Sequence, residues 1–304
     1  KKIYPRKSSL NLKQLILFML LKTILALLCP LLVVSCGKES LPISPERQDD
    51  MTVSFLGNIG PSTRATDSNF ETGDAIGVFA IEKTSSNPDG DILTSNHADN
   101  VKYSYSGGSF KGASTVIKQI TFQRLMFYKA IYPYTSSARN EFTFSVKTNQ
   151  SYGDYYTLCD LMTADTEATT EVTPHLVFSH KLSNIIINLK YEEKPGGSEQ
   201  MFFNNVLVEA KANINENTFT AFGTTKTVIA SGNGNNSFKV ILPPQTIAEK
   251  VTLITLKVGS KTFTFFPESD FIWKSGMQYT YDVTVSKAGI ISFTSSINPW
   301  ETDN

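Results

Sequence analysis

The sequence is poor in cysteine, in histidine and in helical periodicity, and each shortage narrows the classes of protein to which it can belong. It contains three cysteines and three histidines, namely Cys29, Cys36, Cys159, His97, His175 and His180. The histidines are too far apart along the chain for a local motif such as His-x-x-x-His. The fold could still bring them together, but we interpret each as a hydrogen-bonded structural residue and predict no metal site. Cys159 lies in no signature of a cysteine hydrolase, and we interpret it as a buried core residue.

The chain also lacks the local signatures of common enzymes. It has no glycine-rich phosphate loop, serine elbow or paired-carboxylate signature, so we expect no catalytic residue, no cofactor and no enzyme activity. An enzyme that acts on surface polysaccharide would need two carboxylates across a cleft, and the sequence leaves that arrangement open. Asp89, Asp91 and Asp99 have the oxygen ligands of a calcium site but not the spacing of a calcium loop, and we interpret them as a solvated turn.

An excess of positive charge is missing as well. The whole chain carries 28 basic and 28 acidic residues. Six of the basic residues and none of the acidic ones precede Cys36, so the chain that follows has 22 against 28 and a net charge of −6. Proteins that bind nucleic acid present a basic face to the phosphates. The charge balance therefore predicts no nucleic-acid partner.

The N-terminal part of the sequence contains an apolar run, Ile24–Val34, which follows Lys22 and ends in Val-Val-Ser-Cys. This ending resembles a bacterial lipobox, in which small residues precede the cysteine whose thiol receives diacylglycerol. We predict that residues 1–35 form a lipoprotein signal peptide, with lipidation at Cys36. The protein would then be exported and held to a membrane by lipid.

A transmembrane helix from Leu15 to Val34 is the alternative for the same run, since its length suits a bilayer. Lys22 and Pro30 interrupt that span, which favours the signal peptide. A compact signal peptide would begin at Met19, and we expect the true start there.

After the lipobox, the sequence predicts a tether and then a series of short strands. Residues 36–50 are rich in Ser, Pro, Glu and Asp, with little that could pack, and we predict a tether there. Met51, Val53 and Phe55 alternate with polar residues, which is typical of a half-buried strand. We expect Gly57 to end that strand.

The remaining sequence repeats short apolar runs separated by Gly, Pro, Asn and Ser turns. Such spacing favours a β-sandwich in each half of the chain. We place the domain boundary at 174, which gives an N-terminal domain over residues 51–174 and a C-terminal domain over residues 175–304. The fold class that we predict is all-β.

The C-terminal segment has a second alternating strand. Ile291, Phe293 and Ile297 lie on one face of it, and Trp300 follows Asn298-Pro299. Two interpretations stay open: the strand completes its own sandwich, or it reaches a neighbouring molecule.

Several motifs in order resemble the fimbrillin family, the lipoprotein subunits of type V pili in Bacteroidales. Each motif is weak alone, whereas their order and spacing along the mature chain are more specific. They are the lipobox at Cys36, Thr-Arg-Ala-Thr around Arg64, Gly-Asp-x-Ile-Gly-Val-Phe ending at Phe79, Tyr-Pro-Tyr at Tyr132, Asp160-Leu161-Met162, Phe178 to Ser183, Gly276 to Val285, and Pro299-Trp300.

The resemblance implies two transthyretin-like β-sandwich domains in tandem and a fimbrial subunit, or a fimbrium-associated outer-membrane lipoprotein, that contributes to cell adhesion. Its partners would be other fimbrial subunits, joined by β-strand addition, together with the outer membrane. The resemblance also implies proteolytic processing between Arg64 and Ala65, with Met51, Val53 and Phe55 as the displaced strand. Ile291, Phe293, Ile297 and Trp300 would then form the donated strand.

The alternative function is that of a surface lipoprotein that does not polymerise and binds a glycan or a host ligand. A processing site at Arg64 would serve polymerisation and would be pointless in such a binder.

Overall fold

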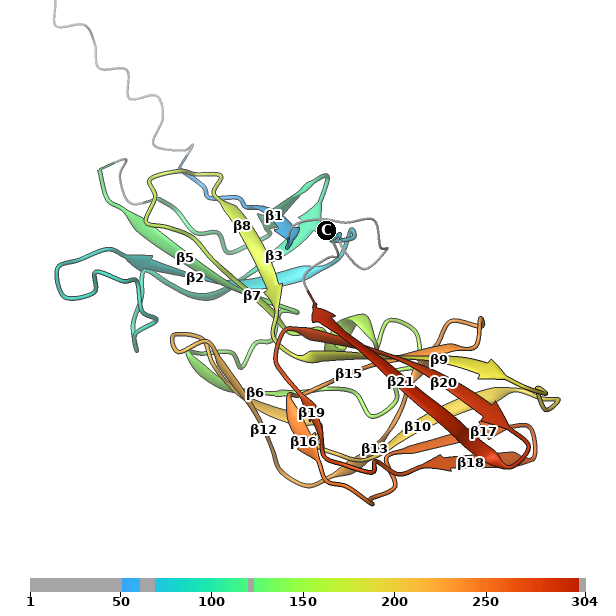
Figure 1. Ribbon diagram of the computed structural model, residues 1–304. Helices are drawn as coiled ribbons and strands as arrows, with labels where there is room; N and C mark the ends of the chain where they lie inside the picture. Colours follow the sequence, from blue (N-terminus) through green and yellow to red (C-terminus); the bar gives the residue numbers. More distant parts are fainter. Residues whose placement is uncertain (1–50, 61–68, 120–122, 301–304) are drawn as a thin grey trace, which may run out of the picture. The chain divides into compact units, whose positions relative to one another are not determined.

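The computed structural model describes residues 51–60, 69–119 and 123–300 (Figure 1). Strands dominate these ranges, and the helical element within them is a short 3₁₀ turn, η2 (Thr157–Cys159). The all-β prediction is therefore confirmed. Among the described residues no helix has the length and apolarity to span a bilayer. The predicted tether at 36–50, together with Cys36, Arg64 and Ala65, lies outside the described residues.

A seven-stranded sheet contains most of the N-terminal part of the chain. In spatial order its strands are β1 (Leu56–Ile59), β8 (His175–His180), β7 (Met162–Asp165), β5 (Met126–Tyr132), β2 (Ala75–Glu82), β3 (Ala98–Ser106) and β4 (Ser109–Gly112). The pairing of β1 with β8 is parallel, and the other pairings are antiparallel. β2 is buried at six successive positions, because its two faces pack into two different core clusters.

One face of this sheet encloses an aromatic-rich core. The cluster takes Val53, Phe55 and Ile59 from the start of the described chain and further apolar residues from the strands already named. Phe55 has edge-to-face contacts with Tyr103 and Tyr128, at ring-centroid distances of 4.9 and 5.2 Å. Such pairs add to the free energy gained by burying the rings.

The C-terminal part of the chain forms four further sheets (Figure 1). The largest contains β14 (Ser231–Gly232), β15 (Ser237–Leu242), β9 (Ser183–Tyr191), β20 (Met277–Ser286) and β21 (Gly289–Pro299) in that order. A four-stranded sheet contains β13 (Lys226–Ile229), β10 (Glu199–Val206), β17 (Ile254–Val258) and β18 (Lys261–Phe265). A three-stranded sheet contains β12 (Thr218–Phe222), β11 (Glu209–Asn213) and β6 (Glu141–Ser145) in that order. A two-stranded sheet contains β16 (Gln245–Ile247) and β19 (Phe271–Trp273).

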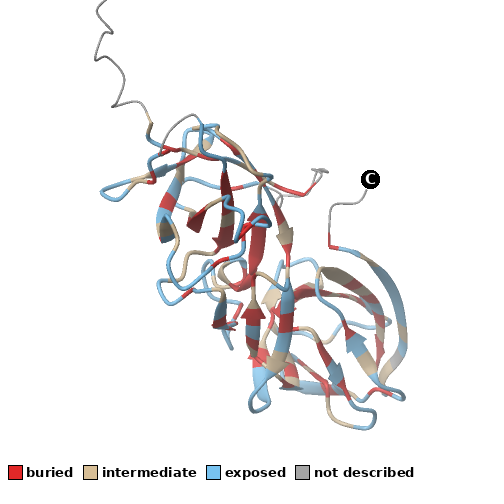
Figure 2. Ribbon diagram, turned by 90° about the vertical axis from the view of Figure 1, so that its left-hand side faces the viewer, coloured by how far each residue is buried: buried red, intermediate tan, exposed pale blue. Residues whose placement is uncertain are grey.

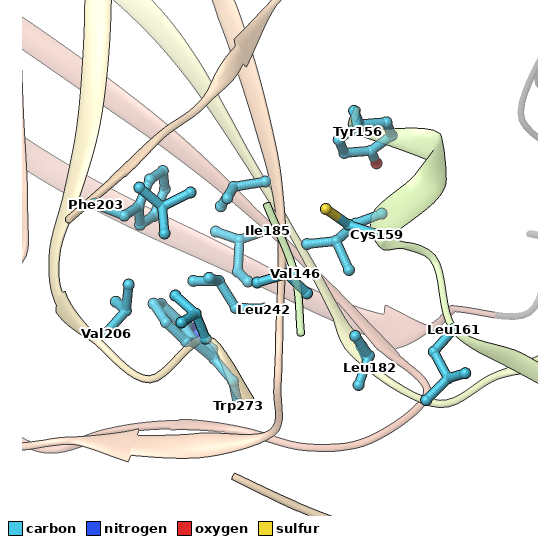
Figure 3. Close-up of a cluster of buried hydrophobic side chains, with 14 of the residues drawn as sticks. Val146, Tyr156, Cys159, Leu161, Leu182, Ile185, Phe203, Val206, Leu242 and Trp273 are labelled. Carbon is cyan, nitrogen blue, oxygen red and sulfur yellow. The ribbon is translucent and has the colours of Figure 1, made fainter. Parts of the chain in front are cut away.

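The inner faces of these sheets share one apolar cluster, part of which appears in Figure 3. Cys159 lies in it, fully buried, as the sequence predicted. Burial raises the pKa of the Cys159 thiol to about 12, and its Sγ accepts a hydrogen bond from the Lys147 N–H at 3.1 Å. A thiol with so high a pKa is a packing group and not a nucleophile.

Strand pairing crosses the predicted boundary at 174 in both directions. β8 lies after it and pairs with β1 and β7 in the N-terminal sheet. β6 lies before it and pairs with β11. Alternation along a strand does not reveal which neighbour the strand joins, so the pattern alone could not place these two elements. The domain limits, and the tandem transthyretin-like division, stay predictions.

Candidate functional site

Residues 51–60, which we call the plug segment, lie between two strand edges of the N-terminal sheet. On one side the Val53 N–H donates to the carbonyl of Ile117 at 2.8 Å. Phe55 and Phe110 exchange both backbone hydrogen bonds, at 3.1 and 2.8 Å. The odd-numbered residues of the plug segment thus bond to the edge formed by β4 and the residues after it.

The even-numbered residues bond to the opposite edge. The Ser54 N–H donates to the carbonyl of Val172 at 2.9 Å, and the Leu56 N–H donates to that of Pro174 at 3.1 Å. Further along, Leu56 to Ile59 run parallel to His175 to Phe178. The plug segment is therefore bonded as a central strand, although it comes first in the described chain.

The side chains of the plug segment match this position. Phe55 is 0% exposed and Ile59 is 5% exposed, and both face the core. Val53 is also buried, whereas Met51 is half-buried. The predicted alternation of Met51, Val53 and Phe55 is thus present, but the sequence placed the end of the strand too early. Regular strand β1 begins at Leu56, because pairing with β8 carries the chain through Gly57 and Asn58.

Gly57 is needed at its place for a steric reason. A Cβ added there would lie 2.8 Å from Cε2 of Phe110 and 3.3 Å from its Cδ2. Contacts under 3.0 Å require a neighbour to move, and Phe110 is fully buried. The glycine that suggested a turn in the sequence instead lets the strand approach an aromatic ring closely.

The predicted donor strand, β21, occupies a different kind of position. It pairs antiparallel with β20 along its length and forms the outer edge of the five-stranded sheet within the described ranges. Phe293 is half-buried and stacks on Phe265 at 4.2 Å. Ile297 is 55% exposed. Figure 2 shows β21 coloured mainly exposed and intermediate, with a buried position at its end. The side chain of Ile291 is not among those described.

Trp300 closes the end of this strand. It is 9% exposed, its N–H donates to the carbonyl of Gly276 at 2.7 Å, and its ring stacks on that of His180 at 4.0 Å. His180 Nδ1 is 2.8 Å from Oδ1 of Asp160. His180 is thus a hydrogen-bonded structural residue, as the sequence predicted, and its ring also positions the last described residue.

The ends of the plug segment and of β21 meet at one cavity. Ile59 and Trp300 both line a space of about 130 Å³. Phe70, Tyr132 and Asp160 are among its other walls. The Tyr132 hydroxyl donates to Oδ1 of Asp74 at 3.0 Å, and burial raises the pKa of Tyr132 far above its ordinary value. Sequence reasoning missed this meeting point, because no local pattern links residues so far apart in the chain.

The other residues considered for chemistry have structural contacts. His97 Nε2 is 2.8 Å from the carbonyl of Lys118. Asn96 donates to Asp99, at 2.6 Å, within the turn considered for calcium. The described part of the chain brings no three His, Cys, Asp or Glu side chains together in a cluster that could hold a metal.

A family model described as fimbrillin-like matches residues 63–300 of this chain. A protein of Bacteroides uniformis named "Putative fimbrium subunit Fim1C" is 26% identical over 302 residues, covering 92% of this chain and 95% of the relative.

Two crystal structures described as a "putative cell adhesion protein" have the same fold. The Bacteroides ovatus structure gives a TM-score of 0.66 at 20% identity, covering 83% of this chain and 99% of the other. The Bacteroides uniformis structure gives 0.63 at 23% identity, covering 83% of this chain and 100% of the other. At these identities the likeness establishes the fold and nothing finer.

Proposed function

The chain belongs to the fimbrillin-like family, and we propose that it is a fimbrial subunit or fimbrium-associated lipoprotein of the outer membrane that assembles by exchange of β-strands. The observation that carries this proposal is the plug segment, whose backbone bonds to two strand edges at once. Its removal would leave both edges unpaired above an aromatic core. An open edge of that kind accepts a strand from another chain.

Release of the plug segment from the folded chain is energetically unfavourable. Val53, Phe55 and Ile59 are all buried, and full burial of a large apolar side chain contributes about 1.5 to 3 kcal/mol. Exchange therefore needs an event that weakens the attachment of the plug segment to the rest of the chain. We propose proteolytic processing between Arg64 and Ala65, since Arg64 follows the plug segment in a polar stretch of the sequence.

Processing at that bond would separate two functions of the N-terminal region. The lipid on Cys36, the tether at 36–50 and the plug segment would stay on one fragment, and the remaining sheet would be free of all three. An uncut molecule would be an anchored, closed monomer, whereas a cut one would be an assembly-competent subunit. The role is structural and needs no catalytic group or cofactor. Surface exposure in a fimbrium would bring the chain into contact with host or bacterial ligands and so contribute to adhesion.

The N-terminus of the protein recovered from native cell surfaces tests this proposal. A chain that begins at Ala65 and is found in polymers supports a processed subunit. A lipidated Cys36 on every recovered molecule, with no polymer, would instead favour the surface lipoprotein that binds a glycan or host ligand without polymerising.

An Arg64→Ala variant provides the matched test in cells, with Arg139→Ala as the control because Arg139 is an exposed arginine far from residue 64 in the sequence. We expect the Arg64 variant to accumulate as lipidated monomer and the Arg139 variant to assemble as the parent does. Normal polymers from the Arg64 variant would contradict the processing step. A Cys36→Ala variant tests the anchor, because it should lose labelling by a palmitate analogue.

A further inference from the structure

The C-terminal part of the chain presents an aromatic ring to solvent. Tyr152 is 67% exposed, more than any other large apolar side chain in the described part of the chain. A single exposed aromatic residue is common on protein surfaces and indicates little alone. Two features set Tyr152 apart: the segment that carries it is held firmly, and a polar pocket lies beside it.

The segment is residues 149–156, which we call the aromatic loop, and Gln150 fastens it to the core. The Gln150 side chain is 0% exposed. Its amide donates to the carbonyl of Ile241 at 2.8 Å and accepts from the Ile241 N–H at 2.9 Å. The Gln150 N–H donates to the carbonyl of Ile229 at 2.9 Å. Moving the loop would leave these buried polar groups without partners, so its position is fixed.

The Tyr152 ring is itself supported within the aromatic loop. It meets Tyr155 edge to face at a centroid distance of 5.4 Å, and the Tyr155 N–H donates to the carbonyl of Tyr152 at 3.1 Å. The Nζ of Lys147 lies 5.4 Å from the centroid of Tyr155 on its ring face. An exposed ring that is already held in place loses little conformational entropy when a ligand covers it.

A polar pocket of about 470 Å³ begins at Ser151, the neighbour of Tyr152 in the chain. Ser237 of β15 forms another wall. Lys239 lies on the same face of β15, two residues on, and its Nζ is 4.0 Å from the centroid of Tyr156. The aromatic loop thus covers this strand at Lys239 and leaves it open at Ser237. The volume lies within the usual range of small-molecule sites.

Hydroxyl and amide groups make up most of the polar lining of this pocket. They belong to Ser151, Ser198, Gln200, Asn236 and Ser237. Hydroxyl and amide side chains can both donate and accept hydrogen bonds. Among the described residues, the side chains of Ser198, Gln200 and Ser237 have no hydrogen-bond partner, so their donors and acceptors are open to a ligand.

The charge in the pocket is balanced. Glu199 is the one ionisable residue among the described residues that line it. Its Oε2 is 3.2 Å from Nζ of Lys194, and its Oε1 accepts a hydrogen bond from the Tyr191 hydroxyl at 2.5 Å. Since a neighbouring cation compensates the carboxylate, the pocket favours a ligand without net charge.

We propose that this pocket binds a neutral hexopyranose unit of a glycan, with Tyr152 as the stacking surface and Gln200 and Ser237 as hydrogen-bond partners. A pyranose ring has hydroxyl groups around its edge and an apolar C–H face, and these match a polar pocket with an aromatic ring at its rim. The inference goes beyond the proposed function, because it needs no strand exchange. It names a class of ligand for adhesion and the residues that hold it.

Sugar binding to the uncut full chain tests the class of ligand. The probes are the methyl glycosides of glucose, galactose, mannose and N-acetylglucosamine, screened by saturation-transfer NMR and then titrated. We expect at least one of them to bind. Methyl glucuronide, which carries a carboxylate, should bind at least about tenfold more weakly than methyl glucoside, because its charge would approach Glu199.

Binding of none of the four neutral probes would overturn the proposal. Equal or tighter binding of the glucuronide would overturn the neutral class. Because the chains are uncut monomers, either result is independent of strand exchange and leaves the proposed function standing.

Variants of Tyr152 test the stacking surface. Tyr152→Ala should weaken binding of the best probe about tenfold, whereas Tyr152→Phe keeps the ring and should stay within about threefold of the parent. Phe266→Ala is the matched control, since Phe266 is another exposed ring, at 48%, outside the aromatic loop. Unchanged melting of each variant would show that folding is intact. Equal affinities of the Tyr152→Ala and Phe266→Ala variants would overturn the role of Tyr152.

A serine variant tests the pocket itself. Ser237→Ala should weaken binding about threefold to tenfold, the effect of losing one hydrogen bond to the ligand. Ser292→Ala, at an exposed serine of β21, is the matched control and should bind as the parent does. Gln200→Ala should act as Ser237→Ala does. Parent-like binding by both pocket variants would place the sugar elsewhere and overturn the site.

Discussion

The plug segment and β21 have the same alternating pattern and opposite environments. The backbone of the plug segment has hydrogen bonds on both sides, and its Phe55 side chain is fully buried. β21 is bonded on one side within the described ranges, and Ile297 is largely exposed. The comparison teaches that the pattern of a strand determines which face is apolar, whereas the rest of the chain determines whether that face is covered. In this protein the apolar face of the plug segment is covered by the core, whereas the apolar face of β21 is only partly covered.

The largest expected difference comes from removing each segment in turn. Deletion of residues 51–60 should sharply lower the melting temperature of the N-terminal sheet, because it opens two strand edges and exposes an aromatic core. Deletion of residues 290–304 should leave a folded monomer, since β20 still pairs with β9 along its other edge. Calorimetry of the two variants measures this. An unchanged N-terminal transition in the variant without the plug segment would contradict this prediction. So would the loss of a cooperative transition of the C-terminal sheets in the variant without β21.

A smaller contrast follows from truncating one phenylalanine in each of the two segments. Phe55→Ala should lower the free energy of unfolding by about 3 to 5 kcal/mol, the usual cost of emptying a closed aromatic site. Phe293→Ala should cost about 1 to 2 kcal/mol, because its ring is half-buried and its neighbours can relax toward solvent. Urea unfolding of the two variants measures both changes in the free energy of unfolding. Equal losses would mean that β21 is as firmly held as the plug segment.

Replacing one small residue in each segment by alanine should also have different effects on stability. Gly57→Ala is expected to destabilise the monomer by about 1 to 3 kcal/mol, since the added methyl group overlaps the Phe110 ring. Ser295→Ala should change stability by less than about 0.5 kcal/mol, as is usual at an exposed position. Thermal melting of both variants is the measurement. If Gly57→Ala were neutral, the Phe110 ring would have room to move, and the close approach at Gly57 would not limit stability.

Much of the fold was predictable, because strands and turns leave local signals. The sequence indicated an all-β chain, the alternation of Val53 and Phe55, and the burial of Cys159, and the structure confirms each. These features depend on period-two alternation and on the usual burial of free cysteine. The extent of β1 was wrong, because Gly57 and Asn58 have the composition of a turn and pairing with β8 overrides it.

The arrangement around the site could not be read from the sequence. The two edges that hold the plug segment come from residues 110–119 and 172–178, and nothing local connects them to residue 55. The sequence indicated a structural role for His180, but not that its ring supports Trp300. Which distant segments pair depends on the whole fold. The alternation within a strand shows its apolar face but not its neighbours, so a single sequence does not reveal the pairing.

The most local effect is expected at the end of β21, and it tests whether contacts of its own hold that strand in place. Trp300 stacks on His180 at 4.0 Å, and this pair holds the terminus of the strand against the end of β8. Trp300→Ala should remove the ring pair, which contributes about 0.5 to 1.5 kcal/mol, together with the burial of the indole ring, which is 9% exposed. Hydrogen exchange should quicken in the last residues of β21, from Ile297 to Trp300, and stay unchanged in the plug segment. Trp300→Phe keeps a ring over His180 and should restore most of the protection. If exchange quickened along all of β21, Trp300 would secure the whole strand, and its release would be the step that frees the donor. If only the end responded, the Phe293 contacts would be the stronger restraint on donation.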